Sequence, residues 1–339
     1  MLSSLWEGLG TGTTLELGRL TFTREEIVSF AAEFDGQPFH LDDDAARHTL
    51  LGGLSASGWH TCIMIANLLS RAVARQSIDV EIAGVGEVIW LKPVRPDDEI
   101  SVKVTWGKKQ ACVCGGGLLA CAAMIEACNG RGERVLRWQA DCIFRRRNEV
   151  QQPSEANCGL RRAHRSRANR RSKIDFIKFF DDIAEGDTIE LGEYVFTGDR
   201  IADFRRQYFP GGLPEERCER TISGRAAPTA AGWHVAAAWM HCIVRYYGWQ
   251  SERLRRLGRP VPLLGPAAGI RHLRWHAPVR AGTVVSFRAW AERKLEISSH
   301  PDWGLLVVGA EGLDSRRKPV VSFYPLMLLQ RSSSTSHSF

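Results

Sequence analysis

The sequence predicts an α+β protein built from two similar units in tandem. A long apolar segment of helical character occurs in each half, at residues 59–73 and again after Gly232, and segments with strand patterns follow it. One long helix followed by antiparallel strands is typical of a sheet that wraps around a helix. The 339 residues also exceed the length of one typical domain and suffice for two, each with its own core.

The first half begins with short extended segments within residues 14–22, followed by a helix. Thr23 and Glu26 have the spacing of a capping box, which marks a helix start. Apolar residues then recur at helical spacing, namely Ile27, Phe30, Ala31 and Phe34. We expect this helix to end at Asp35, because a glycine and a proline follow within three residues.

Strand patterns dominate after the long apolar helix. Residues 85–91, 100–106 and 136–144 are rich in β-branched and aromatic residues or alternate apolar with polar residues. The least regular part is residues 107–130, which begins with a segment that has neither alternation nor a hairpin signal. The flanking strands favour a paired strand there, and a local disturbance of the reading frame is a second hypothesis.

The second half repeats the first, and the spacing between matching residues is constant up to the start of the long helix. Phe22-Thr23 recurs as Phe196-Thr197, and Gly58-Trp59-His60 recurs as Gly232-Trp233-His234, in both cases 174 residues later. After the helix the spacing becomes 185, and Trp90, Pro93, Val94 and Arg95 match Trp275, Pro278, Val279 and Arg280. The chain is therefore an internal duplication with about eleven extra residues after the second long helix.

This repeat divides the chain into a first unit at 1–147, a linker at 148–173, a second unit at 174–330 and a tail at 331–339. The formal charge of +7 is concentrated around the linker. The basic residues of this stretch, which begins just before the linker, are Arg145, Arg146, Arg147, Arg161, Arg162, Arg165, Arg167, Arg170, Arg171 and Lys173. Because no aromatic residues and no binding motif accompany them, a solvated linker is favoured over a nucleic-acid site.

Composition indicates a cytoplasmic protein without a membrane segment. No apolar run reaches the roughly 18 residues of a membrane span, and the N-terminus lacks a basic region followed by an apolar core. Nine scattered cysteines indicate reduced thiols rather than disulfides. Four of them cluster at Cys112, Cys114, Cys121 and Cys128, but their spacing fits no usual zinc site and no histidine lies among them, so we expect no metal.

The best candidates for chemistry are Asp35 and His40, an acid and a base five positions apart. Eighteen residues further on, Gly58 follows Ser57 and opens the long helix, where a backbone N–H at the positive end of the helix dipole can stabilise an anion. In the second half, Asp35 falls on Phe209 and His40 on Pro214. We therefore expect one active site per chain.

Other polar and aromatic residues near these positions have structural interpretations. His60 recurs as His234 in the unit that lacks the acid and base, so a structural role such as bonding a nearby carbonyl is favoured. Trp59 and Trp233 recur likewise and are expected in the core or at an interface. The aspartates at 42–44 are expected to cap a short helix rather than bind a metal.

The segment Asp35-Gly36-Gln37-Pro38-Phe39-His40-Leu41-Asp42, followed by Ala56-Ser57-Gly58, resembles the D-x-N-P-x-H motif of the MaoC-like dehydratases, the (R)-specific enoyl-CoA hydratases of hotdog fold. The repeat resembles the tandem double-hotdog form, in which each unit wraps an antiparallel sheet around a long central helix and the two units pair sheet to sheet. Three features depart from the pattern: Gln37 replaces the usual Asn, Ser57 stands where the hydratases usually carry His, and the second motif is lost.

The resemblance implies reversible hydration of 2-enoyl-CoA to 3-hydroxyacyl-CoA, with one water held by Asp35 and His40. Gly58 and Ser57 would contact the thioester, and acyl-CoA would bind in a tunnel between the units. Arg95 and Arg280 follow equivalent turns. Each of them would either contact the CoA phosphates or lie in a turn exposed to solvent. No separate cofactor is implied, because CoA is part of the substrate, and the chain would be a monomer of two units or a homodimer.

Two alternatives remain open at this stage. A thioesterase can use the same fold, but thioesterases of this fold usually rely on a carboxylate without a paired histidine, so His40 argues against this reading. A non-catalytic acyl-CoA-binding or assembly protein is favoured by the lost second motif and by the irregular stretch at 107–130. The intact first motif opposes it.

Overall fold

Two units that share a common order of a strand, a helix, a long helix and four strands form the chain. The computed structural model describes residues 10–75, 78–111, 119–146, 172–175, 177–210 and 228–332. The first unit contains β1 (Thr14–Thr21), α2 (Arg24–Phe34), α3 (Pro38–Leu41), α4 (Asp43–Arg47), α5 (Gly58–Ala74), β2 (Ile78–Trp90), β3 (Glu99–Ala111), β4 (Leu119–Asn129) and β5 (Arg134–Arg146). The second contains β6 (Ser172–Lys173), η1 (Phe180–Asp182), β7 (Asp187–Phe196), α6 (Gly198–Tyr208), α7 (Gly232–Arg256), β8 (Leu264–Trp275), β9 (Thr283–Glu296), β10 (Trp303–Leu313) and β11 (Pro319–Gln330).

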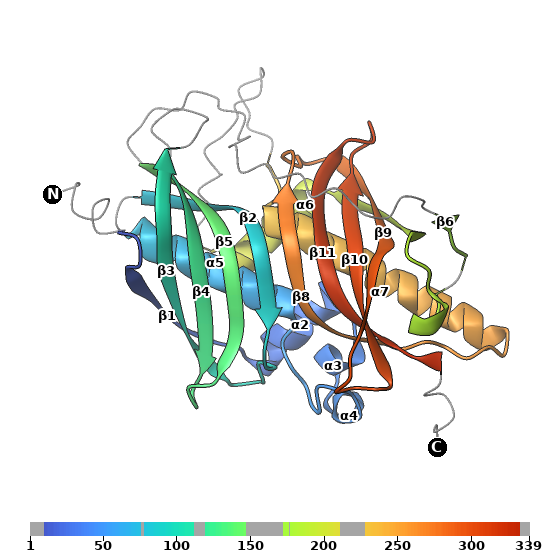
Figure 1. Cartoon of the computed structure of the whole chain (residues 1–339). Coiled ribbons are helices and arrows are strands. Elements are labelled where there is room, and N and C mark those ends of the chain that lie inside the picture. The colour runs from blue at the N-terminus through green and yellow to red at the C-terminus, as the bar shows by residue number, and fades with distance from the viewer. Residues whose placement is uncertain are drawn as a thin grey trace.

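The described strands form one sheet in the order β1-β3-β4-β5-β2-β8-β11-β10-β9-β7-β6. All neighbours are antiparallel except β6 and β7. Strands β2 and β8 join the two units edge to edge, from Gly84 opposite Arg274 to Ile89 opposite Gly269. Helices α5 and α7 lie along the same side of this sheet (Figure 1). The predicted α+β duplication, with one long helix and an antiparallel sheet in each unit, is confirmed.

Helix α2 forms as its sequence predicts. The Thr23 hydroxyl accepts a hydrogen bond from the Glu26 amide at 3.2 Å, and the Glu26 carboxylate accepts one from the Thr23 amide at 3.0 Å, which completes the capping box. All four predicted apolar residues of the helix are buried. The helix ends at Asp35, whose backbone has left the helical region.

The first strand of each unit contains the same bulge. The register of β1 against β3 shifts between Glu16 and Gly18, and that of β7 against β9 shifts between Glu190 and Gly192. Gly18 and Gly192 have φ values of +124° and +99°, which favour glycine because it lacks a Cβ. The bulge explains why the sequence reads as two extended segments within 14–22, although the structure has one strand.

The irregular stretch after residue 106 begins as a bulged strand. Strand β3 continues to Ala111 and pairs with β4, with a register shift between Trp106 and Lys109. A Cβ on Gly107 would lie 3.0 Å from the Ala122 carbonyl oxygen, so a close approach of the two strands requires this glycine. The paired strand expected here is present on both sides, and residues 112–118 lie outside the described part.

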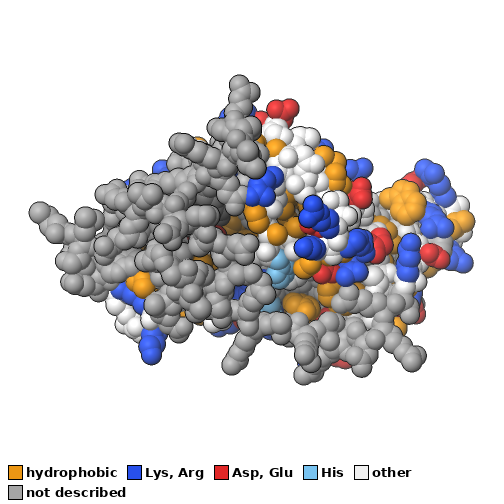
Figure 2. All heavy atoms as spheres, turned by 90° about the horizontal axis from the view of Figure 1, so that it is seen from above, with side chains coloured by type: hydrophobic (Ala, Val, Ile, Leu, Met, Phe, Trp, Pro, Cys, Tyr) orange, Lys and Arg blue, Asp and Glu red, His pale blue; other side chains and the backbone are white. Residues whose placement is uncertain are grey.

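The extra residues of the second unit lengthen its helix. Helix α7 has 25 residues and α5 has 17, and α7 projects beyond the sheet (Figure 1). On this extension the Gln250 side chain donates to the Asp175 carbonyl at 2.9 Å, which anchors the chain that leads into β7. Trp249 remains 60% exposed, and Figure 2 shows Lys and Arg side chains gathered around hydrophobic groups at this end.

Two buried histidines occupy equivalent stacks at the base of the long helices. His60 stacks on Phe30 with ring centroids 4.7 Å apart, and His234 stacks on Phe204 at 4.3 Å. Within the described residues, Nδ1 of neither ring has a hydrogen-bond partner. The structural role takes the form of ring packing, and His234 Nε2 also bonds the Tyr194 hydroxyl at 3.3 Å. Among the described residues, no hydrogen bond from either ring to a carbonyl is found.

The predicted tryptophans lie where the units meet. Trp59 and Trp233 contact each other with ring centroids 6.5 Å apart, and both are buried. Trp59 also contacts Phe323 of β11, whereas Trp233 contacts Trp138 of β5. Each unit thus inserts an aromatic side chain against the other unit's sheet.

Among the described residues, no helix is long and apolar enough to cross a membrane. Most of the basic linker, residues 147–171, lies outside the described part of the chain, and strand β6 stands at the end of the segment assigned to it. The proposed boundaries of the units therefore stay predictions.

Burial of the two histidines predicts that the folded chain is less stable at acidic pH. Desolvation, assisted by His40 near His60 and by Arg200 and Arg205 near His234, lowers the pKa of each imidazole from 6.5 to about 3. Between these values the unfolded chain binds protons that the folded chain does not, so stability falls as pH drops from 6.5 toward 3. Each unit of pKa difference corresponds to about 1.4 kcal/mol.

We expect the variant His60→Phe/His234→Phe, which keeps both stacks, to lose a measurable part of this pH dependence. The measurement is the free energy of unfolding by urea between pH 4 and pH 7. Exposed His300→Gln serves as the control and should leave the slope unchanged. An unchanged slope in the double variant would contradict the assignment.

Candidate active site

Asp35 lies at the C-terminal end of α2 and is 3% exposed. Its Oδ1 accepts a hydrogen bond from Gln37 Nε2 at 2.8 Å, and its Oδ2 accepts one from the Ser57 hydroxyl at 2.7 Å. Two donors from different parts of the chain therefore orient the carboxyl group.

His40 lies on the short helix α3 and is 5% exposed. Its Nδ1 is 2.7 Å from the Ser55 carbonyl oxygen. A carbonyl only accepts hydrogen bonds, so Nδ1 carries a proton, and Nε2 is the nitrogen that can accept a proton when the ring is neutral. Nε2 lies 3.4 Å from Asp35 Oδ2. The structure thus brings together the predicted acid and base, with the basic nitrogen directed at the carboxylate.

Ser57 and Gly58 form the start of α5. The Ser57 hydroxyl accepts a hydrogen bond from the Trp59 amide at 3.2 Å and donates to Asp35, so one group both caps the helix and holds the acid. In the described part of the chain, no group accepts a hydrogen bond from the Gly58 amide. This amide lies at the positive end of a 17-residue helix and can stabilise a developing anion.

The requirement for glycine at position 58 has a packing origin. A Cβ on Gly58 would lie 2.3 Å from the Trp90 ring, and one on Gly232 would lie 2.6 Å from the Trp275 ring. Trp275 Nε1 also donates to the Gly232 carbonyl at 2.7 Å. Because the second unit repeats the arrangement without the acid and base, the glycine serves the close approach of a tryptophan in both units.

The second unit has lost the hydrogen-bonded pair in a matched way. Phe209 occupies the position of Asp35 at the end of α6, and Ala231 occupies the position of Ser57 before α7, where no side chain caps the helix. Because the residues at both positions are apolar, neither leaves a buried polar atom without its hydrogen-bond partner. Pro214, the counterpart of His40, lies outside the described residues. The described residues therefore contain one pair of this kind, Asp35 with His40.

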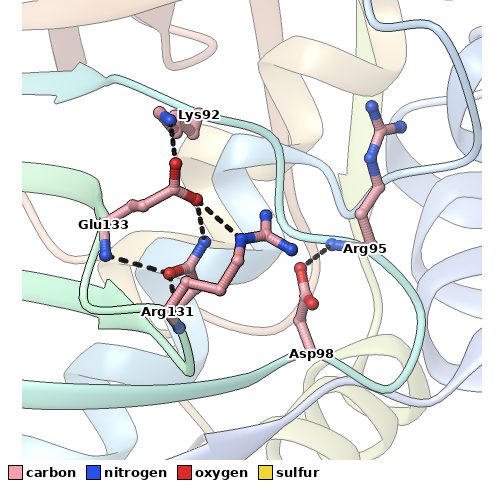
Figure 3. Close-up of polar contacts among 6 residues, drawn as sticks. Lys92, Arg95, Asp98, Arg131 and Glu133 are labelled. Atoms are coloured by element: carbon pink, nitrogen blue, oxygen red, sulfur yellow. Dashed lines mark hydrogen bonds and ion pairs between the residues drawn. The ribbon is translucent and has the colours of Figure 1, made fainter.

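Arg95 holds the loop that leads to Ser55 and Ser57. Its guanidinium donates to the backbone carbonyls of Gly53, Leu54 and Leu51. Its own amide donates to Asp98 at 2.8 Å, whereas the side chain points away from the cluster of Lys92, Arg131 and Glu133 (Figure 3). Burial lowers the pKa of the Arg95 side chain. These contacts give Arg95 a structural role in the loop.

The remaining predicted residues lie apart from the acid and base or have structural partners. Arg280 is exposed and its backbone pairs with Thr229. Asp42 caps α4 by accepting from the Ala45 amide at 2.8 Å, as expected. In the described ranges no group of three or more His, Cys, Asp or Glu side chains could hold a metal, and Cys112 and Cys114 fall outside these ranges.

The second unit contributes to the surroundings of the acid. A Cβ on Gly36 would lie 3.8 Å from the Val244 side chain of α7. His241, one turn earlier on α7, has its Nδ1 2.6 Å from the Glu33 carbonyl oxygen and donates to it. Helix α7 therefore packs against the end of α2 that presents Asp35.

The polar partners of the pair were not identified from the sequence. Gln37 was recognised only as a departure from the usual Asn, although its side chain binds Asp35. The Ser55 carbonyl, which determines the tautomer of His40, belongs to a backbone group and has no sequence signal. The resemblance predicts a contact between Ser57 and the thioester, whereas the hydrogen-bond partner of Ser57 in the structure is Asp35.

Comparison with known proteins places this geometry in a class. The overall fold is shared with a MaoC domain protein from Chloroflexus aurantiacus, which has a TM-score of 0.69 at 14% identity and covers 95% of this chain and 96% of its own. RV0216 of Mycobacterium tuberculosis, described as a double hotdog fold, has a TM-score of 0.67 at 12% identity over 96% of this chain and 98% of its own. The protein therefore has a double hotdog fold.

Sequence similarity identifies the family. The MaoC like domain matches residues 10–113. The uncharacterized protein YdeM of Bacillus subtilis is 33% identical over 137 residues, which cover 40% of this chain and 94% of YdeM. The chain belongs to the MaoC-like family, as the resemblance of its Asp35–His40 segment indicates.

The double role of Ser57 predicts an unusually costly alanine substitution. Thr197→Ala removes a helix cap at α6, where the hydroxyl accepts from the Arg200 amide, and should lower the unfolding free energy by about 1 kcal/mol. Ser57→Ala should cost about 1–3 kcal/mol more, because it also removes a donor from the buried Asp35. Urea denaturation measures both, and equal losses would contradict the contact with Asp35.

Proposed function

We propose that the protein catalyses the reversible hydration of 2-enoyl-CoA to 3-hydroxyacyl-CoA, and therefore acts as a hydro-lyase. The observation that carries this proposal is the buried pair of Asp35 and His40, with Nε2 of the histidine 3.4 Å from Asp35 Oδ2. Membership of the MaoC-like family supports hydratase or dehydratase chemistry in general. The thioester substrate and the roles below are our assignment.

Hydration needs a water held by two groups that can exchange protons with it. A water beside the pair can reach both His40 Nε2 and Asp35 Oδ2, which lie 3.4 Å apart. Its oxygen adds to the β carbon as one group takes its proton, and a proton passes from the pair to the α carbon. Positioned groups of this kind contribute about 10²–10⁴-fold each, and their low exposure strengthens such interactions because little water screens them.

The thioester oxygen gains negative charge during this addition. We assign its stabilisation to the Gly58 amide, where no described group competes for the N–H. Ser57 acts indirectly, since its hydroxyl is directed at Asp35 rather than at a substrate. Arg95 would position the loop, and a contact with CoA phosphates is better assigned to an exposed group such as Arg280.

The second unit serves as a wall for the site and lacks a site of its own. Its Val244 lies against Gly36, next to the acid, whereas Phe209 and Ala231 replace the catalytic carboxylate and its serine. We propose that the acyl-CoA binds between the units. CoA then arrives as part of the substrate and no separate cofactor takes part.

A thioesterase is the nearest rival enzyme, and the position of His40 separates the two functions. Addition of water to a double bond uses two proton-transferring groups on one water, and here both are present. A non-catalytic acyl-CoA-binding protein would have no need for the hydrogen bonds that orient Asp35 and fix the tautomer of His40.

We expect Asp35→Asn and His40→Gln each to lower kcat/KM for crotonyl-CoA by a hundredfold or more. Because both groups act on one water, the double variant should be little worse than either single variant. The assay follows loss of the enoyl thioester absorbance with crotonyl-CoA and with a longer 2-enoyl-CoA. Asp42→Asn, which keeps a helix cap away from the pair, should leave the rate unchanged.

Wild-type protein that binds acyl-CoA but turns over no chain length would contradict the enzyme assignment. It would make the protein an acyl-CoA-binding protein.

The duplication supplies a matched control for the Gly58 amide. Gly58→Ala and Gly232→Ala both force a Cβ against a tryptophan, so each should lose about 1–3 kcal/mol of stability. Only Gly58→Ala displaces the amide that is proposed to stabilise the thioester oxygen. Its turnover of crotonyl-CoA should therefore be at least tenfold lower than that of Gly232→Ala. Equal activities at matched folded fraction would refute the role of this amide.

A further inference from the structure

The outer face of α7 near its C-terminal end carries large hydrophobic side chains that the core does not cover. Trp249 is 60% exposed, and Leu257 at the C-terminal cap is 57% exposed. Gln250 and Leu254 lie on the opposite face and are buried. Arg253 is exposed and lies one turn from each of the two hydrophobic residues. Because residues four positions apart share a helix face, Trp249, Arg253 and Leu257 form one stripe that faces outward.

This end of the helix, residues 245–259, is strongly basic, and we call it the α7 tip. It contains five arginines and one glutamate, a net charge of +4. All five arginines are exposed, namely Arg245, Arg253, Arg255, Arg256 and Arg259. Glu252 pairs with Arg256 at 2.9 Å and with Arg255 at 3.9 Å, so a single acid serves two of them. Positive charge therefore surrounds the hydrophobic groups, as Figure 2 shows for this end of the molecule.

Contacts along the helix hold Trp249 in place. The Arg253 guanidinium carbon lies 5.7 Å from the centroid of the Trp249 ring, and the centroid of the Tyr246 ring lies 6.4 Å from it. The Gln250 side chain donates to the Tyr246 hydroxyl at 3.0 Å and to the Asp175 carbonyl at 2.9 Å. The exposed indole is therefore presented by a turn of helix that is anchored to the body of the second unit.

The fold itself does not require these exposed side chains. The equivalent helix α5 has 17 residues against 25 in α7, so the first unit has no such extension. Among the described residues, Trp249, Leu257 and Leu263 are the most exposed large hydrophobic side chains, and all three lie within residues 249–263. Hydrophobic groups that gather at one place on the surface, surrounded by polar residues, are typical of a surface that binds a partner.

The composition of the α7 tip fits a lipid surface better than a protein partner. A stable protein interface buries about 800 Å² on each side, around a centre depleted of charge. Here Arg253 separates Trp249 from Leu257 on a helix that projects beyond the sheet (Figure 1), so the tip offers no centre of that kind. At a bilayer, tryptophan and leucine enter the boundary between headgroups and acyl chains, while long basic side chains extend toward the phosphates. Arginine suits this role because its planar guanidinium binds a phosphate through two hydrogen bonds.

We propose that the α7 tip binds the surface of a lipid bilayer that contains anionic phospholipids. The helix lies against the headgroups, with Trp249 and Leu257 inserted and Arg253 between phosphates. The inference goes beyond the proposed reaction and does not depend on it, since the tip contains neither Asp35 nor His40. It gives the second unit a further function besides that of a wall for the site.

Flotation of the full chain with lipid vesicles tests the proposal. The probes are vesicles of phosphatidylcholine alone and vesicles in which about 30% of the lipid is phosphatidylglycerol, which gives the surface a negative potential. We expect the chain to partition at least tenfold more strongly onto the anionic vesicles. Raising the salt from about 0.05 M to about 0.5 M should reduce this partitioning at least tenfold, because salt screens the attraction between arginines and headgroups.

A charge variant and a matched control test the arginines. Arg253→Gln/Arg256→Gln should weaken partitioning onto anionic vesicles about 25-fold, at about fivefold for each basic residue near the surface. Arg47→Gln/Arg206→Gln removes the same charge from exposed arginines of α4 and α6, each of which also pairs with an aspartate of its own helix. This control should leave partitioning nearly unchanged.

The hydrophobic contribution has a control of the same kind. Trp249→Ala should weaken partitioning about tenfold, because binding to a bilayer scales with the apolar area that is buried. Leu91→Ala removes a side chain that is 47% exposed elsewhere on the molecule, and should have no effect. All these variants replace exposed side chains, so each should keep the unfolding midpoint of the wild type in urea.

Equal partitioning of the wild type onto the two kinds of vesicle, or equal losses in the tip variants and their controls, would overturn the proposal. Self-association that Trp249→Ala abolishes, in a chain that does not float with anionic vesicles, would also overturn it. The α7 tip would then be a contact between two copies of the chain.

Discussion

Pairing of β2 with β8 is the interaction on which the rest of the structure depends. Backbone hydrogen bonds between these strands convert two sheets into one. Side chains reinforce the seam, since Arg271 of β8 binds Glu87 of β2 at 2.8 Å and Arg274 binds Asp141 of β5 at 3.0 Å. Because each helix lies on its own sheet, this edge-to-edge pairing places α5 and α7 on one side and brings Trp59 against Trp233.

This arrangement explains why duplication allowed the two units to diverge. The features that build the frame are kept in both, including the bulge glycines and the stacked His60 and His234. The polar pair of Asp35 and Ser57 is kept in one unit, and Phe209 with Ala231 replaces it in the other. A buried carboxylate without its donor is costly, so the two positions change together.

The candidate site is supported mainly by backbone groups and by side chains that hold the acid, the base and the loop before α5. A carbonyl of the loop before α5 sets the tautomer of His40, and Arg95 holds that loop through three other carbonyls. Gln37 and Ser57 orient the acid from both sides. A substitution in this supporting set therefore changes the geometry of the acid and base without removing either one.

The sequence by itself determined the elements and the repeat. The patterns that predicted them are local in the sequence: the helix cap and apolar periodicity at 23–34, and the alternation of apolar and polar residues in the strands. The repeat was visible as a constant spacing of 174 residues. The structure confirms the helices and strands that these patterns predict. The motif likewise singled out Asp35 and His40, which the structure places 3.4 Å apart. Only the tertiary structure decided the partners: Ser57 for Asp35, Trp90 for Gly58, three carbonyls for Arg95, and α7 beside Gly36. These contacts join residues distant in the chain, so no local pattern contains them, and they follow from how the helices dock on the joined sheet.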